Sequence, residues 1–389
     1  MLKQLKIENF RCFKSFELNQ LGRVNLLVGK NNSGKTSILE AIQLLHSGNN
    51  IDALKRIMHH RDNLLLKKDI EKEESNFDWD LIFYQYQKSE ENYINIKGNN
   101  KSENINIELL IKYSLDHLYA KFLRENENIY YSKNIDSNHE EKTSNFKLKE
   151  YVFFLNWIYE NKDYQVSYKT GYTIDLKIFK RDINYSGDVK LNNIEQNNFI
   201  LNQTMISSAS LNIYQAIEMF NKIVLTENED FVYQALKIIE PKIKRISPIM
   251  SIDKNNYYEG FWVLLSDNNK RIPIGNMGDG VWRMLSLSLA LVAAKDGVLL
   301  VDEINTGLHY TALEDMWELI WETAKKLNVQ VFATTHSRDC YEALEVLANR
   351  DDVGEEDISI QRIEKDATKS VPYNKEEIAV AAEREIEVR

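Results

Sequence analysis

A short stretch of the sequence has the residue types and the spacing of a phosphate-binding loop. Residues 29–37 are GKNNSGKTS and fit the pattern G-x-x-x-x-G-K-[ST]. Glycines in such a loop let backbone N–H groups point inward, where the N-terminus of the following helix adds positive potential for a phosphate. Lys35 would reach the β- and γ-phosphates, and the hydroxyl of Thr36 would ligate Mg²⁺. The stretch therefore predicts binding of a nucleoside triphosphate with Mg²⁺.

The residues around this loop predict the strand and the helix that the pattern requires. The apolar run 24–28 is typical of a buried strand, and residues 37–45 carry apolar side chains at helical spacing. The alternative is a glycine-rich turn that binds nothing, and the strand–loop–helix context argues against it. We expect the following residues to contact the nucleotide: Gly29, Asn32, Ser33, Gly34, Lys35, Thr36 and Ser37.

Two consecutive carboxylates far downstream could supply the chemistry of hydrolysis. Asp302 and Glu303 directly follow the apolar run 298–301, which predicts a buried strand. Asp302 would hold Mg²⁺ through water, and Glu303 would polarise the attacking water. Acidic pairs after apolar strands also occur as helix caps, but the phosphate loop favours the catalytic interpretation.

A histidine follows another predicted strand, residues 330–334. The imidazole of His336 at this strand end could hydrogen-bond the γ-phosphate, whereas a histidine that caps the following helix is the alternative. The predicted catalytic residues are therefore Lys35, Glu303 and His336, and the predicted metal ligands are Thr36 and Asp302.

The charge of the chain bears on its partners. The 49 basic and 59 acidic residues give a formal net charge of -10. A protein that grips many phosphates of duplex DNA usually carries the opposite bias, so direct DNA binding is possible but not favoured. Local basic clusters at 177–181 and 242–245 are more often solvated faces than DNA-binding patches.

Composition indicates a cytoplasmic protein. Cys12 and Cys340 lie far apart and outside any metal-ligand spacing. The first residues lack the apolar core of a signal peptide, and no apolar run approaches the roughly 20 residues of a membrane span. We expect no membrane association.

The pattern of predicted elements implies an α/β fold with a mixed or parallel phosphate-loop sheet, an antiparallel β lobe and a helical insertion. The expected divisions are 1–75 for the first part of the ATPase core, 76–205 for the β-rich lobe, 206–250 for the helical insertion and 251–389 for the second part of the core.

Individual elements follow from local patterns. Predicted strands outside the core are 2–10 with a hairpin partner at 16–18, then 78–84, 93–97 with a hairpin partner at 105–111, and 172–178. Residues 151–160 could be strand or helix, and residues 124–149 a loop or a poorly ordered segment. Predicted helices are 36–48, 51–75, 210–244, 281–294, 313–327 and 339–348.

Four segments occur in a fixed order within residues 1–50 and 270–345: IENFRCFKSFEL, GNMGDGVWRML, LLVDEINTGLH and VFATTHS. Together with the phosphate loop they resemble the ABC-type ATPase heads of the SMC and RecF class. More closely, they resemble AAA-labelled, ABC-like ATPases related to the OLD (overcoming lysogenization defect) nucleases. The resemblance implies an ABC-type ATPase head and hydrolysis of ATP to ADP and phosphate, which we expect to be slow.

The resemblance also implies roles for single residues. Lys35 and Thr36 match the Walker A pair, Asp302 and Glu303 the Walker B pair, and His336 the switch histidine. Residues 305–309 match the D-loop.

Residues 276–280 lie where the family has its signature motif, before a helix that faces the γ-phosphate of a second subunit. The implied nucleotide contacts in this motif are Asn276, Gly278 and Gly280. The segment departs from the LSGGQ of transporters, because Asn276 replaces the serine and Asp279 brings a negative charge near phosphates. We expect a homodimer or a higher homo-oligomer.

Two further motifs are less specific. Arg11 matches an arginine that approaches the nucleotide in related heads, with an ordinary surface arginine as the alternative. Gln85 and Gln87 follow a predicted strand, but neither is assigned as the Q-loop.

OLD nucleases continue after the ATPase with a metal-dependent TOPRIM domain, and this sequence has a helix and a charged tail there. We therefore expect a nucleotide-switched sensor or scaffold that controls a separate effector, a nuclease or a toxin, in defence against phage. The alternative is a RecF-like DNA-maintenance ATPase that binds DNA directly. A transporter subunit is disfavoured, because the LSGGQ motif is missing and the middle of the chain is large.

Overall fold

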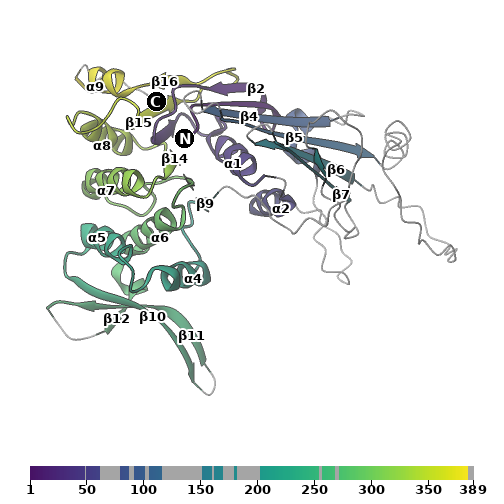
Figure 1. Ribbon diagram of the computed structural model, residues 1–389. Coiled ribbons are helices and arrows are strands. Elements are labelled where there is room, and N and C mark those ends of the chain that lie inside the picture. Colours follow the sequence, from purple (N-terminus) through teal and green to yellow (C-terminus); the bar gives the residue numbers. More distant parts are fainter. Residues whose placement is uncertain are drawn as a thin grey trace, which may run out of the picture.

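A computed structural model describes most of the chain (Figure 1). The described residues are 1–48, 50–61, 79–86, 92–100, 105–115, 151–159, 162–169, 179–181, 202–253, 256–267 and 271–383. The predicted loop 124–149 and the predicted strand 172–178 lie outside these residues, as does the part of the predicted helix 51–75 that follows residue 61. Within them, no helix is long and apolar enough to cross a membrane.

A six-stranded sheet forms the centre of the molecule, with the strand order β16-β15-β3-β14-β13-β9. Its strands are β3 (Val24–Val28), β9 (Gln203–Ile206), β13 (Val298–Val301), β14 (Gln330–Thr334), β15 (Ile358–Arg362) and β16 (Val371–Tyr373). All neighbours pair in parallel except β15 and β16. Every residue of β3, β13 and β14 is buried, as expected where helices cover both faces of a parallel sheet.

Helices cover the two faces of this sheet. Side chains of α6 (Asp279–Ala293), α7 (Leu313–Lys326) and α8 (Arg338–Ala348) share a core with one face. Helix α1 (Lys35–His46) packs on the other face, with α2 (Ile51–His60) beside it. The last described helix is α9 (Lys375–Glu383).

A seven-stranded antiparallel sheet lies on the far side of α1 (Figure 1). Its order is β2-β1-β4-β5-β6-β7-β8. The strands are β1 (Gln4–Phe10), β2 (Phe13–Leu18), β4 (Asn92–Asn100), β5 (Ile105–Leu115), β6 (Tyr151–Tyr159), β7 (Lys162–Lys169) and β8 (Phe179–Arg181). The predicted hairpins β1–β2 and β4–β5 are confirmed, and residues 151–159 form a strand.

The predicted strand 78–84 is wrong. Residues 79–86 form two short 3₁₀ helices, η1 (Trp79–Ile82) and η2 (Tyr84–Tyr86). The carbonyl oxygens of Leu81 and Ile82 accept hydrogen bonds from the side chain and the backbone N–H of Arg11. Phe83, between the two 3₁₀ helices, forms an isolated antiparallel bridge with Phe10, so single contacts with the β1–β2 turn, and not a strand ladder, hold this segment.

After β9, the chain forms two helices, α4 (Ile213–Ile223) and α5 (Glu229–Ile239). The predicted helix 210–244 is thus two helices, and the second ends at Ile239 because Glu240, directly before Pro241, has an extended backbone with a φ of -135° and a ψ of 93°. A three-stranded antiparallel sheet follows, made of β10 (Ile243–Asp253), β11 (Asn256–Leu265) and β12 (Arg271–Pro273).

The α/β class predicted from the sequence, with its parallel sheet, antiparallel lobe and helical segment, is confirmed. The expected boundaries at 205 and 250 fall inside β9 and β10, and β1 and β2 belong to the antiparallel lobe although they precede the phosphate loop.

Candidate functional site

The phosphate loop connects the buried strand β3 to α1 through unusual backbone angles. Gly29 and Gly34 have φ values of 144° and 101°, and Asn32 has a φ of 61°. A Cβ on Gly29 would lie 2.3 Å from the carbonyl oxygen of Ile363, and one on Gly34 would lie 2.4 Å from the ring of Phe13. Both positions therefore require glycine for conformation and for space.

The ammonium group of Lys35 lies inside the turn of this loop. Its Nζ donates to the carbonyl oxygens of Gly29 at 2.8 Å and of Lys30 at 3.1 Å. Burial lowers the pKa of Lys35, while the carboxylates of Glu303 and Asp302 act in the opposite direction. An ammonium has three donors, so one remains for a phosphate oxygen.

Asp302 lies at the end of β13, where three elements bring oxygen atoms together. Its carboxylate accepts from the hydroxyl of Thr36 at 3.2 and 3.3 Å and from that of Thr334 at 2.6 Å. Carboxylate and hydroxyl oxygens are hard ligands, which suit Mg²⁺, and Mg²⁺ usually binds one or two protein groups plus substrate phosphates. The donor set therefore fits the predicted metal ligands Thr36 and Asp302.

Glu303 follows directly and has a left-handed backbone, with a φ of 47°. Its N–H donates to the hydroxyl of Thr334 at 2.9 Å. Its carboxylate lies 2.9 Å from Nδ1 of His336, and the side chain of His336 is 59% exposed. The structure thus brings the predicted base and the predicted switch histidine into contact at the surface of the site.

Two residues of this cluster were not foreseen from the sequence. Thr334 links Asp302 to the backbone of Glu303, and its place as the last residue of β14, next to β13, was the available signal. Arg283 of α6 is 1% exposed and donates to the carbonyl oxygens of Asp302 and Glu303. No local sequence pattern indicates that an arginine within an apolar helix contacts a site formed by other elements.

The segment that matches the family's signature motif lies at the start of α6. Residues 274–277 form a 3₁₀ turn, η3 (Ile274–Met277), and Gly278 follows with a φ of 86°. Asn276 and Gly278 are exposed, and a Cβ on Gly278 would meet nothing within 4 Å. A Cβ on Gly280 would lie 3.1 Å from the carbonyl oxygen of Gly307. The first turn of α6 therefore packs on the loop after β13.

The predicted D-loop, residues 305–309, is held at its first residue by a side-chain hydrogen bond. The carboxamide oxygen of Asn305 accepts from the hydroxyl of Thr335 at 2.7 Å. At its last residue, the ring of His309 is tilted by 38° against that of the neighbouring Tyr310, with 4.4 Å between centroids, and Tyr310 is 62% exposed.

Arg11 lies against α1, close after the phosphate loop. Its Nε is 3.3 Å from the carboxylate of Glu40, which also accepts from Nε of Arg61 at 2.8 Å. The structure thus places Arg11 on a buried carboxylate of the helix that follows the loop. Of the two glutamines considered for a Q-loop, Gln85 is exposed and hydrogen-bonds Tyr84, and Gln87 lies outside the described residues.

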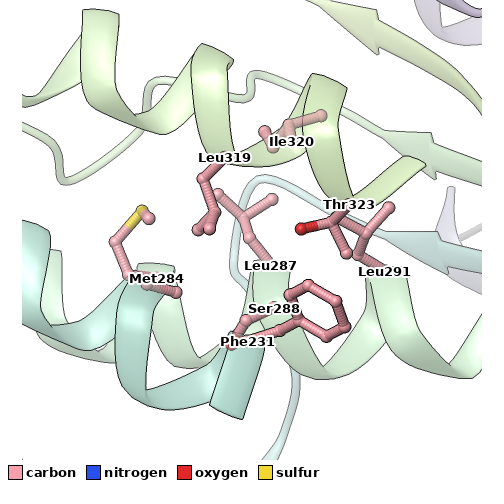
Figure 2. A pocket seen from close by; sticks show the side chains of 9 residues that line it. Phe231, Met284, Leu287, Ser288, Leu291, Leu319, Ile320 and Thr323 are labelled. Atoms are coloured by element: carbon pink, nitrogen blue, oxygen red, sulfur yellow. The ribbon is translucent and has the colours of Figure 1, made fainter. Parts of the chain in front are cut away.

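A small apolar cleft lies among α5, α6 and α7 (Figure 2). Its lining is Phe231, Ala235, Met284, Leu287, Ser288, Leu291, Leu319, Ile320 and Thr323. The lining carries no charged group that could meet a triphosphate, so the candidate site is the cluster at the ends of β3, β13 and β14.

One domain family and several known proteins are similar to this chain. The family described as the AAA ATPase domain matches residues 1–340. An ATP/GTP phosphatase of Helicobacter pylori is 25% identical over 366 residues, which cover 90% of each chain. The DNA replication and repair protein RecF of Clostridioides difficile is 53% identical over 47 residues, 12% of this chain and 13% of that protein. The SMC head domain from Thermotoga maritima aligns over 96% of this chain and 98% of its own, with 12% identity and a TM-score of 0.41.

Proposed function

We propose a function for this chain on the basis of its family: the chain belongs to the AAA ATPase domain family, which matches residues 1–340. We infer that the chain binds ATP with Mg²⁺ and hydrolyses it slowly to ADP and phosphate. The observation that carries this proposal is the meeting of Lys35, Thr36, Asp302, Glu303 and His336 at the ends of three neighbouring parallel strands.

Each side chain has a role that its contacts support. The backbone N–H groups of residues 29–37 and the ammonium of Lys35 would bind the β- and γ-phosphates. Thr36 and Asp302 would hold Mg²⁺, which when bound would offset the negative charge of the phosphates. Nucleotide contacts by Asn32, Ser33 and Ser37 belong to the same proposal.

Glu303 would orient the attacking water and accept its proton, since a carboxylate near the site is a suitable general base. His336 would hold that carboxylate through the 2.9 Å contact and present its imidazole to the γ-phosphate. The catalytic contribution is then positioning and charge stabilisation, which suffices for phosphoryl transfer to water.

The substitution Glu303→Gln tests this assignment, because an amide cannot accept the proton of water. Steady-state hydrolysis should fall by about 100-fold or more while ATP binding is retained. Glu342→Gln is the control, since Glu342 is a partly exposed residue of α8 paired with Arg338. Turnover of Glu303→Gln at the rate of the parent protein would contradict the role of Glu303.

We further propose that ATP controls association of two or more copies. The exposed Asn276 and Gly278, and Gly280 beside the loop after β13, would complete the site of a second copy. Sedimentation of Glu303→Gln with and without ATP tests this, and equal sedimentation in both conditions would contradict it.

The output of such a switch would be a change of shape that a separate effector, a nuclease or a toxin, detects. The resemblance to OLD-related ATPases supports a role in defence against phage, and it is the basis of this part of the proposal. A RecF-like function with direct DNA binding is the second candidate, favoured by the local identity to RecF. Measurement of DNA binding at several salt concentrations, with and without ATP, distinguishes the two functions. A net charge of -10 favours weak DNA binding by this chain.

A further inference from the structure

The guanidinium of Arg283 is the most extensively bonded buried cation near the candidate site. Its donors reach the carbonyl oxygens of Asp302 at 3.0 Å, Glu303 at 2.8 Å and Ile304 at 3.4 Å. They also reach the carbonyl oxygen of Ser207 at 2.9 Å and the hydroxyl of Ser210 at 3.2 Å. One side chain therefore binds three consecutive peptide groups of the segment that carries the predicted base.

That segment needs support, because its backbone is not in a preferred conformation. Glu303 has a φ of 47°, and residues other than glycine enter this region at an energetic cost that the surroundings must offset. The carbonyl oxygen of Glu303 also accepts from the N–H of Thr306 at 3.1 Å. Arg283 supplies the charged donor to the same oxygen, so it helps to fix the direction in which the carboxylate of Glu303 points.

The first turn of α6 touches the same loop a second time, further along. A Cβ on Gly307 would lie 3.3 Å from Cβ of Asp279, and one on Gly280 would lie 3.1 Å from the carbonyl oxygen of Gly307. The start of α6 therefore contacts the loop 302–307 at its beginning, through Arg283, and near its end, through Asp279 and Gly280. A displacement of the start of α6 would displace this loop.

We propose that Arg283 is a positioning residue that ties the N-terminal part of α6 to the backbone of Asp302 and Glu303 and so holds the base in the orientation for hydrolysis. This inference rests on the proposed function in that the reaction is ATP hydrolysis. The inference extends the proposed function, because it names the contact through which a displacement of the start of α6 would reach Glu303.

Arginine suits this role better than lysine does. Its planar group presents five donors in a fixed geometry, whereas an ammonium has three on a flexible stem. Burial lowers the pKa of Arg283 to about 10, against the opposing effect of the Asp302 and Glu303 carboxylates, so the group remains charged at neutral pH.

The experiment compares Arg283→Lys and Arg283→Met with matched substitutions of Arg23. Arg23 also donates to two main-chain carbonyl oxygens, those of Ala324 and Val329, at the opposite end of β3 from the phosphate loop. We expect kcat of Arg283→Met to fall about 10- to 100-fold with ATP affinity little changed, and Arg283→Lys to lie between it and the parent. Arg23→Lys should hydrolyse ATP like the parent.

A double substitution tests whether Arg283 acts through Glu303. In the Glu303→Gln background, Arg283→Lys should lower the residual rate by less than about twofold, because groups that act as a unit are not additive. An undiminished effect of Arg283→Lys in that background would overturn the proposal.

A measurement without turnover separates this proposal from the function it rests on. Amide hydrogen exchange of residues 302–306 should be faster in Arg283→Lys than in the parent and in Arg23→Lys. If the parent does not hydrolyse ATP but exchange accelerates only in Arg283→Lys, the function fails while the positioning role stands. Exchange and kcat of a folded Arg283→Lys that both equal those of the parent would overturn the positioning role.

Discussion

The two large sheets of this molecule differ in what their strand ends can do. In the parallel sheet, β3, β13 and β14 end at the same edge, and they are followed by the phosphate loop, by Asp302 and Glu303, and by His336. In the antiparallel sheet, successive strands end at opposite edges. Of the predicted nucleotide contacts, only Arg11 comes from that sheet, in the β1–β2 turn. The comparison shows how parallel pairing gathers residues that are distant in sequence into one site.

Helix α1 is the layer that joins the two sheets. It contacts β1, β4 and β5 on one side and β9, β13 and β14 on the other. Its first residues, Lys35 and Thr36, belong to the site, whereas Glu40 holds Arg11 of the antiparallel sheet. The N-terminus of α1 therefore contributes to the nucleotide site, whereas the rest of the helix supports the fold. The predictions below test this difference.

The largest expected effect is that of Lys35→Ala. It removes charged hydrogen bonds to phosphates, so ATP binding should weaken by about 100-fold, roughly 3 kcal/mol. Lys97→Ala is the control, since Lys97 is an exposed lysine on β4 of the antiparallel sheet. Calorimetric titration with ATP measures both variants. Comparable losses in the two would remove the functional difference between the sheets.

Glu40→Gln should affect folding more than chemistry. The carboxylate of Glu40 is 4% exposed and lies between Arg11 and Arg61, so the substitution removes a buried negative charge that faces two guanidinium groups. The free energy of unfolding should fall by about 3 kcal/mol, measured by urea denaturation. Glu17→Gln, which alters an exposed pair with Lys6, should cost less than about 1 kcal/mol. Unchanged stability with altered ATP affinity would instead support a nucleotide contact by Arg11.

His46 offers a pH test of the same layer. Its Nδ1 lies 2.9 Å from the carbonyl oxygen of Ile42, so this nitrogen carries the proton of the neutral ring. Burial lowers the pKa of His46 from 6.5 to about 4, so the folded state binds fewer protons than the unfolded chain between these values. The contribution of His46 to stability is therefore present above pH 6.5 and is lost as the pH falls toward 4.

The comparison variant is His46→Gln, which keeps a donor and cannot titrate. Between pH 7 and pH 4.5, the parent should lose roughly 2 kcal/mol more of its free energy of unfolding than this variant does. His309→Gln, at an exposed histidine, should follow the parent across the same range. Parallel pH profiles for His46→Gln and the parent would contradict a buried neutral imidazole.

The sequence revealed the parts of the site that depend on local spacing. The phosphate loop lies within nine consecutive residues, and Asp302 and Glu303 directly follow a strand. It did not reveal Thr334 and Arg283, because their roles depend on which strands are neighbours and on which face of α6 meets the loop after β13. The 3₁₀ turns at 79–86 were missed for the same reason, since Arg11, far away in sequence, binds their carbonyl groups.

The smallest expected effects come from two buried threonines, and they sharpen the comparison within the parallel sheet and its helices. Thr334 at the end of β14 has a hydroxyl that donates to Asp302 and accepts from the N–H of Glu303. Thr323 on α7 is 1% exposed, and its hydroxyl has no hydrogen-bond partner among the residues that the structure describes. It lies in the lining of the apolar cleft (Figure 2). Substitution by valine keeps the shape of the side chain. It therefore removes two hydrogen bonds at Thr334 and none at Thr323.

Thr334→Val should raise the Mg²⁺ concentration needed for half-maximal hydrolysis by about tenfold, because the hydroxyl orients a metal-binding carboxylate. Thr323→Val should leave that concentration unchanged and raise the free energy of unfolding by roughly 1 kcal/mol, because it removes a buried polar atom without a partner. Magnesium titrations of ATP hydrolysis and urea denaturation of both variants give the four values. If Thr334→Val needs no more Mg²⁺ than Thr323→Val does, the hydroxyl of Thr334 has no part in the metal site. The carboxylate of Asp302 would then be oriented by the hydroxyl of Thr36, with the backbone of Asp302 held by Arg283 and by the carbonyl oxygen of Ile206.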